Sequence, residues 1–207
     1  MKAIRTLLVI YAGILLSGCA LTVDEIDVPY QGKANISVVD GADQIKVSVS
    51  NTDNRTVYKD RVSSKKNGYG MEMAAIIATN DVSETFRDAV AFELESLGFQ
   101  VVEDGDADLN VGLVRFYNDF KIGMFAGDAV ADGLINIVVK DKSGDLIFSK
   151  SYEGGAIEAD IQLASGSNAR LALIGAMADI VSKIANDKDL HQSLLSIKNN
   201  NEDIPTS

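Results

Sequence analysis

Apolar residues at every second position predict several strands in this chain. Ile45, Val47 and Val49 alternate with polar residues, which is the pattern of a strand with one buried face. Alternation begins again at Leu109 and changes phase at Val114, which predicts a bulge within a long strand. Shorter runs predict further strands at 35–39, 73–79, 99–102, 133–140 and 146–154. A hairpin turn at 141–145 joins the last two of these strands. The charged, glycine-rich residues 56–70 predict an exposed loop or hairpin.

Apolar positions spaced by three and four residues predict two long helices. The first follows Asp81, whose side chain is placed to cap it, although Asn80 could supply the cap instead. Gly98 stands where a left-handed C-terminal cap belongs. The second helix starts at residue 167 or 168 and is broken at 186–187, and a short amphipathic helix through 190–197 follows it.

The order of these elements predicts the fold class. A strand–helix–strand crossover beside a three-stranded meander gives an α/β (α+β) domain with a single mixed, mostly antiparallel sheet. We expect the two main helices to pack on one face of that sheet, with the short C-terminal helix after them. The expected core is Val47, Val49, Phe86, Val90, Leu94, Val111, Ile137, Phe148, Met177 and Ile180.

The N-terminus has the pattern of a secretion signal. Lys2 and Arg5 precede an apolar run over residues 7–16, which is too short to span a hydrocarbon core of about 30 Å. The residues that follow, Leu16-Ser17-Gly18-Cys19, resemble the bacterial lipobox. The alternative is an ordinary cleaved signal followed by an unrelated cysteine.

The lipobox resemblance implies cleavage between Gly18 and Cys19 and attachment of lipid to Cys19. Several acyl chains exceed what stable membrane anchoring requires. An aspartate after the cysteine commonly signals inner-membrane retention in such lipoproteins. Ala20 stands there instead, which implies the outer membrane.

These patterns divide the chain into four parts. Residues 1–18 are the expected signal peptide, and residues 19–34 are the lipidated cysteine with a flexible tether. Residues 35–197 are expected to form one periplasmic domain, and the polar residues 198–207 a disordered tail.

Charge and composition exclude several function classes. The chain has 19 Lys and Arg against 30 Asp and Glu, a net charge of −11, so it lacks the basic footprint of a nucleic-acid-binding protein. Attraction of the protein to anionic headgroups would be poor as well, so the covalently attached lipid would have to anchor it. With the single cysteine lipidated, no thiol remains for disulfides or soft metals, and we expect neither a cofactor nor a metal.

Catalytic signals are weak in this sequence. His191 is the only histidine, and no Gly-x-Ser-x-Gly motif accompanies it, so we expect no enzyme. Asp104, Asp106 and Asp108 have the spacing of calcium ligands. However, residues 109 and 115 are leucine and arginine where a calcium loop needs glycine and glutamate, and a solvated turn is the alternative we favour.

Two pairs of residues are candidates for partner binding. Asp53 and Arg55, at a strand end, would either recognise a carboxylate or peptide backbone or form a turn-stabilising ion pair, and we favour the second. Met124 and Phe125 lie in the apolar, glycine-punctuated segment 122–127. They would either contact a partner or lipid from an exposed loop or tuck over a sheet end, and we again favour the second.

Short motifs over roughly residues 40–197 resemble the YajG-type lipoproteins, small bacterial envelope proteins without an assigned activity. The motifs are the lipobox, Val47-Ser48-Val49 with Asp53-Asn54-Arg55, the helix end at Gly98-Phe99, Ala107-Asp108-Leu109-Asn110-Val111, Tyr117 with Asp119, and Asp187-Lys188-Asp189-Leu190-His191. The chain departs from the family at 56–72 and in its polar tail. The resemblance supplies no catalytic residues.

We therefore expect a non-enzymatic, outer-membrane-anchored lipoprotein whose periplasmic domain binds an envelope protein during envelope assembly or maintenance. The alternative is a carrier or transport auxiliary that binds an amphipathic small molecule or lipid. An apolar pocket opening between loops would indicate the carrier. A filled core with a flat patch or a free strand edge would indicate the protein-binding module.

Overall fold

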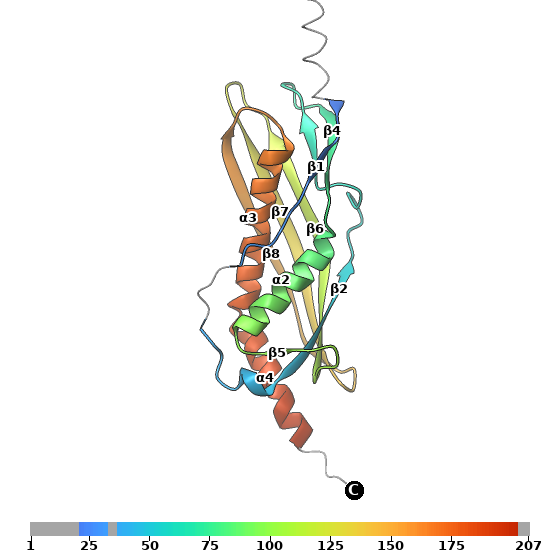
Figure 1. Cartoon of the computed structure of the whole chain (residues 1–207), viewed down its shortest axis with the longest axis vertical. Coiled ribbons are helices and arrows are strands. Elements are labelled where there is room, and N and C mark those ends of the chain that lie inside the picture. Colours follow the sequence, from blue (N-terminus) through green and yellow to red (C-terminus); the bar gives the residue numbers. More distant parts are fainter. Residues whose placement is uncertain (1–20, 33–36, 203–207) are drawn as a thin grey trace, which may run out of the picture.

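An antiparallel meander of three long strands forms the centre of the protein (Figure 1). The computed structural model describes residues 21–32 and 37–202. The three strands are β6 (Ala107–Lys121), β7 (Gly127–Asp141) and β8 (Leu146–Ile161). The bulge expected near Val114 is confirmed, because the register of β6 against β7 shifts between Leu113 and Arg115.

Two shorter strands share the other edge of β6. β2 (Lys46–Asp53) pairs in parallel with the first half of β6, and β3 (Ser63–Lys66) pairs with it farther along. β4 (Glu72–Ala78) and then β1 (Asp24–Ile26) lie outside β3, while β5 (Gln100–Val101) lies beside β2. The result is one open eight-stranded sheet, and the expected α+β fold with a mixed sheet is confirmed.

Two long helices lie on one face of this sheet (Figure 1). The helical elements are η2 (Ala42–Gln44), α2 (Val82–Ser96), α3 (Gly166–Ala185) and α4 (Lys188–Glu202). Asp81 caps α2 as expected, because its Oδ1 accepts hydrogen bonds from the backbone N–H groups of Ser83 (2.8 Å) and Glu84 (3.2 Å). Gly98 has a φ of 100°, the left-handed geometry expected after this helix.

The core fills the space between the helices and the sheet. Val49 and Phe148 are only partly buried, and the other expected core residues are buried. α3 comes close to the sheet because glycines face it: a Cβ built on Gly133 or Gly154 would lie 2.8 or 2.7 Å from Ile180. None of the helices within residues 21–32 and 37–202 is both long and apolar enough to cross a membrane.

The segment expected to be a tether is part of the fold over most of its described length. Residues 24–26 form β1, which pairs in parallel with β4, and Ile26 and Val28 are buried. The Tyr30 hydroxyl donates a hydrogen bond to the buried carboxylate of Glu93 on α2. This corrects the boundary expected at residue 34. A strand of three residues is too short to show an alternation of apolar and polar residues, so β1 can be recognised only from its pairing with β4.

Other boundaries also differ from the expected ones. Within the segment 56–70, β3 forms an antiparallel hairpin with β4, so the hairpin alternative is confirmed, but its two serines are buried where exposure was expected. Residues 37–39 do not form part of a strand, β8 continues to residue 161, and α4 continues through 198–202. The expected signal peptide and Cys19 lie outside the described residues.

Candidate functional site

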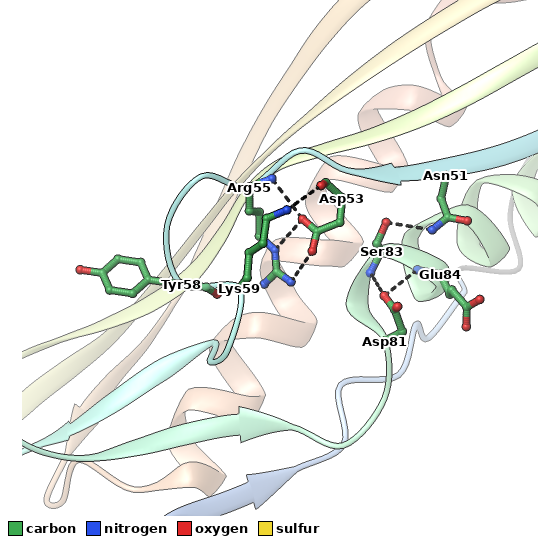
Figure 2. Close-up of polar contacts among 8 residues, drawn as sticks. All are labelled: Asn51, Asp53, Arg55, Tyr58, Lys59, Asp81, Ser83 and Glu84. Atoms are coloured by element: carbon green, nitrogen blue, oxygen red, sulfur yellow. Dashed lines mark hydrogen bonds and ion pairs between the residues drawn. The ribbon is translucent and has the colours of Figure 1, made fainter.

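Asp53 and Arg55 form an internal ion pair at the end of β2 (Figure 2). The Arg55 Nε and Nη2 atoms donate to the two carboxylate oxygens of Asp53 at 3.0 and 2.8 Å. The backbone N–H of Arg55 donates to the same carboxylate, and Arg55 Nη1 donates to the Tyr58 carbonyl at 3.3 Å. Arg55 is only 7% exposed. This geometry favours the turn-stabilising interpretation over recognition of a partner, since the guanidinium already binds within its own turn.

Electrostatics agrees with a structural role for this pair. The hydrogen bond from Arg55 is the largest influence on the pKa of Asp53 and lowers it, and burial opposes it. The Lys59 amino group adds a hydrogen bond to the Asp53 carbonyl at 3.1 Å. Asp53 and Arg55 therefore fix the path of the chain from β2 toward Tyr58.

A second structural cluster joins α4 to β8. Asp187, whose side chain is 7% exposed, accepts hydrogen bonds from Lys150 Nζ (2.6 Å) and the Tyr152 hydroxyl (2.7 Å). Its other oxygen accepts from the backbone N–H of Asp189 at the start of α4. Burial raises the pKa of Asp187, but the hydrogen bonds outweigh burial and the net pKa is lowered.

This cluster predicts a defined dependence of stability on pH. Because the folded pKa of Asp187 lies below the unfolded value of about 3.9, its stabilisation is complete above about pH 4 and is lost as pH falls through the lowered pKa. We expect Asp187→Asn to have an unfolding free energy about 1.5–3 kcal/mol below that of the parent protein at pH 7. On acidification, the unfolding free energy of the variant should fall less than that of the parent protein. Urea unfolding at pH 7 and pH 3 measures both.

The exposed neighbour Asp189 provides the control, since its side chain is 79% exposed. Asp189→Asn should change the unfolding free energy by no more than about 0.5 kcal/mol, because its contact with Lys150 is long (3.9 Å) and exposed. An Asp187→Asn variant that loses as much stability as the parent between pH 7 and pH 3 would contradict this assignment.

The candidate catalytic and calcium-binding residues do not come together into a reactive site. His191 Nε2 lies 3.0 Å from the Ala185 carbonyl oxygen, and burial lowers the pKa of this histidine. Asp106 pairs with Lys142, and Asp108 accepts a hydrogen bond from Ser48. Within the described part of the chain, no group of three or more His, Cys, Asp or Glu side chains could hold a metal ion.

The sheet surface turned away from α2 and α3, here called the open face, carries a hollow of about 350 Å³. Tyr58 and Tyr117 stack at its rim with ring centroids 4.2 Å apart. Arg115 also lines it and pairs with Asp132 (3.2 Å) on β7 and Glu153 (2.6 Å) on β8. Little in the sequence pointed to this site. Tyr117 was noticed only as part of a family-like motif, and Tyr58 lies in a segment expected to be a loop or hairpin.

Tyr58 adopts an uncommon backbone conformation beside this hollow. Its φ is 55°, which a bulky residue seldom adopts without support from its surroundings. The hydrogen bond from Arg55 to its carbonyl and the stack on Tyr117 provide that support. The Asp53–Arg55 pair therefore acts on the open face indirectly, by holding Tyr58 in place.

Small polar residues also lie on the open face. Asn110 Nδ2 donates to Ser50 Oγ at 3.0 Å, and Ser151 Oγ donates to Asn136 Oδ1 at 2.7 Å. Among the described residues, β8 pairs with no strand other than β7, so no strand covers its second edge. α3 contacts the middle of this edge, where Asp179 Oδ2 accepts a hydrogen bond from the Gly155 N–H (3.1 Å) and Lys183 Nζ donates to the Glu153 carbonyl (2.8 Å). The free edge includes two exposed apolar side chains, Leu146 (62%) and Ile157 (64%).

Met124 and Phe125 lie in the turn between β6 and β7 and are 91% and 88% exposed, so the tucked arrangement is wrong. The fold does not bring them near Asp53, which pairs with Leu113 on β6. Eight further residues of β6 separate Leu113 from the end of the strand, about 26 Å. The two candidate partner-binding pairs are therefore separate features.

A solved structure of low sequence identity shares this fold. A DUF330-family protein from Xanthomonas campestris is 12% identical with a TM-score of 0.54, over 87% of this chain and 99% of its own. A minor lipoprotein from Acinetobacter baumannii is 10% identical (TM-score 0.39; 71% and 92% covered). A lipoprotein from Neisseria meningitidis is 15% identical (TM-score 0.35; 69% and 98% covered). The first shows a shared fold, and the TM-scores of the other two are too low to carry an argument.

Sequence comparison gives the family. No curated protein matches the chain. The sequence model of a family described as uncharacterized lipoprotein matches residues 33–195, which includes the whole meander, both long helices and the open face. The YajG-type label is not confirmed, but the broader expectation of a bacterial lipoprotein family is. The chain thus belongs to this family of uncharacterized lipoproteins.

Proposed function

We propose that this protein is an outer-membrane lipoprotein, anchored by lipid on Cys19, whose periplasmic domain binds another envelope protein through the free edge of β8 and the adjoining open face. It acts by binding and not by catalysis. The observation that carries the proposal is the edge of β8, a strand of 16 residues paired on one side only among the described residues.

A free strand edge offers a row of backbone N–H and C=O groups to another chain. Partners that add a strand to such an edge gain main-chain hydrogen bonds, while side chains beside the edge provide selectivity. On β8, Leu146 and Ile157 supply exposed apolar contacts, and the charged Lys150 and Glu153 discourage unselective pairing. These features fit a specific protein partner.

The carrier function has less support. A carrier of this fold would enclose its ligand between sheet and helices, where the buried core residues already pack together. The hollow beside Tyr58 and Tyr117 lies instead on the open face. Its lining includes the charged Arg115, Asp119, Lys121 and Asp132, which suit contact with a protein surface better than enclosure of an acyl chain.

A charge on the free edge tests this proposal. We expect Ile157→Lys to abolish copurification of the partner from solubilised envelopes, because a lysine there would need desolvation against an apolar surface. Fold stability should stay within about 0.5 kcal/mol of the parent protein, since the site is exposed. The measurement is affinity purification with quantitative mass spectrometry, alongside urea unfolding.

Val38→Lys is the matched control, because Val38 is also exposed and apolar (71%) but lies outside the sheet. It should leave the copurifying proteins unchanged. Equal recovery of all copurifying proteins in the parent and both variants would count against the edge of β8 as the binding surface.

A further inference from the structure

We infer that one end of the domain inserts into the membrane surface through an apolar tip formed by three loops. The tip consists of Tyr69 and Met71 between β3 and β4, Met124 and Phe125 between β6 and β7, and Leu163 after β8. The inference rests on the proposed lipid anchor at Cys19, and it adds a second contact that would fix how the domain stands on the bilayer.

The three loops lie together at one end of the molecule (Figure 1). Gly68, Met124, Phe125 and Leu163 line a shared hollow of about 160 Å³, so residues from all three loops are neighbours. Their apolar side chains are nevertheless exposed, with Tyr69 92%, Met124 91% and Leu163 73% exposed. A group of exposed large apolar side chains of this kind marks an interaction surface.

The tip carries no charge. Charged residues make up 24% of the chain, yet residues 67–71, 122–127 and 162–167 contain none. A protein of net charge −11 is repelled by anionic headgroups, and uncharged loops avoid both that repulsion and the cost of dehydrating ions. Tyrosine favours the membrane–water interface, and phenylalanine and leucine insert into the boundary between headgroups and acyl chains.

The described chain begins at the same end. Asp24 forms an ion pair with Lys65 (2.7 Å) at the end of β3 and accepts a hydrogen bond from the Gly166 N–H (2.8 Å). Leu21, three residues earlier, is 64% exposed. Cys19 precedes Leu21 by two residues, which reach at most about 7 Å when extended. A lipid on Cys19 must therefore enter the bilayer close to the tip. For this reason we assign the tip to a lipid surface and not to a protein partner.

The absence of tryptophan from the sequence allows a direct test. The full-length lipidated protein with Phe125→Trp is reconstituted into phosphatidylcholine vesicles with brominated acyl chains. We expect a blue-shifted emission and strong quenching by the bromine atoms, because the ring enters the acyl-chain boundary. Phe125 is 88% exposed, so the substitution should not disturb folding.

Leu146→Trp is the matched control. Leu146 is also exposed (62%) and pairs with Lys140 at the far end of β7, about 45 Å from the tip. Its tryptophan should emit as in water and escape quenching. If the protein floats with the vesicles but the tryptophan of Phe125→Trp stays water-exposed, the proposed insertion of the tip is wrong and the lipid anchor is retained. Protein that does not float with them would overturn both.

Discussion

Replacing Cys19 by serine is expected to release the protein from the membrane fraction. A serine hydroxyl cannot take the thioether-linked diacylglycerol that the lipobox resemblance implies. The remaining chain would hold to a bilayer only through the exposed tip, which is weak compared with several acyl chains at about 0.8 kcal/mol per buried methylene. Cys19→Ser should therefore fractionate as soluble protein or accumulate as uncleaved precursor, as measured by membrane flotation and immunoblotting.

Ala20→Asp tests which membrane the protein reaches, independently of whether Cys19 is lipidated. This variant keeps the cysteine, so it should remain membrane-bound, but it should move to the inner membrane in a sucrose gradient. A Cys19→Ser protein that still cofractionates with the outer membrane would show that the anchor lies elsewhere. An Ala20→Asp protein that stays in the outer membrane would refute only the inference drawn from Ala20.

The second large effect is expected from Gly154→Val. Gly154 pairs with Gly133 across β7 and β8, and α3 passes directly over both. A Cβ at Gly154 would lie 2.6 Å from Asp179 Oδ2 and 2.7 Å from Ile180 Cγ1. A valine there must push α3 away from the sheet, which opens the core around Ile180. We expect a loss of about 3 kcal/mol or more of unfolding free energy.

Urea unfolding followed by circular dichroism measures this loss. Gly68→Val provides the control, because nothing lies within 4 Å of a Cβ at Gly68. The control should unfold close to the parent midpoint. Matching midpoints for Gly154→Val and the parent would mean that α3 can shift without cost, and the close helix–sheet contact would then not be a source of stability.

The parts of the fold that could be predicted from sequence are those with local signals. The cap at Asp81, the left-handed Gly98, the bulge near Val114 and the hairpin turn at 141–145 each depend on residues close together in the chain. The alternation of β2 and β6 revealed their buried faces for the same reason. These elements were sufficient to predict the mixed sheet with two helices on one face.

The missed elements depend on distant partners. β1 is three residues long and exists because β4 lies beside it, and the buried serines of β3 are stabilised by β6, where Ser63 Oγ donates to the Asn118 carbonyl at 2.9 Å. Neither strand has an apolar period. The same limit explains the candidate site, because the free edge of β8 is a property of strand order, and strand order is not visible in any one segment.

The exposure of Met124 and Phe125 was missed for a related reason. Apolar residues in a short, glycine-punctuated turn pack inward or project outward depending on what lies across from them. Here the neighbouring loops carry exposed Tyr69 and Leu163. Only the assembled end of the molecule distinguishes a tucked turn from an exposed tip.

Site-specific photocrosslinking in living cells tests the central claim most directly. A photoreactive residue at Ser151 on β8 should capture one defined envelope protein, identified by mass spectrometry, while the same residue at exposed Glu95 on α2 should not. Both proteins should remain lipidated and folded. Recovery of no protein above background from the β8 position, with a lipid copurifying in its place, would contradict the protein-binding account and favour a carrier.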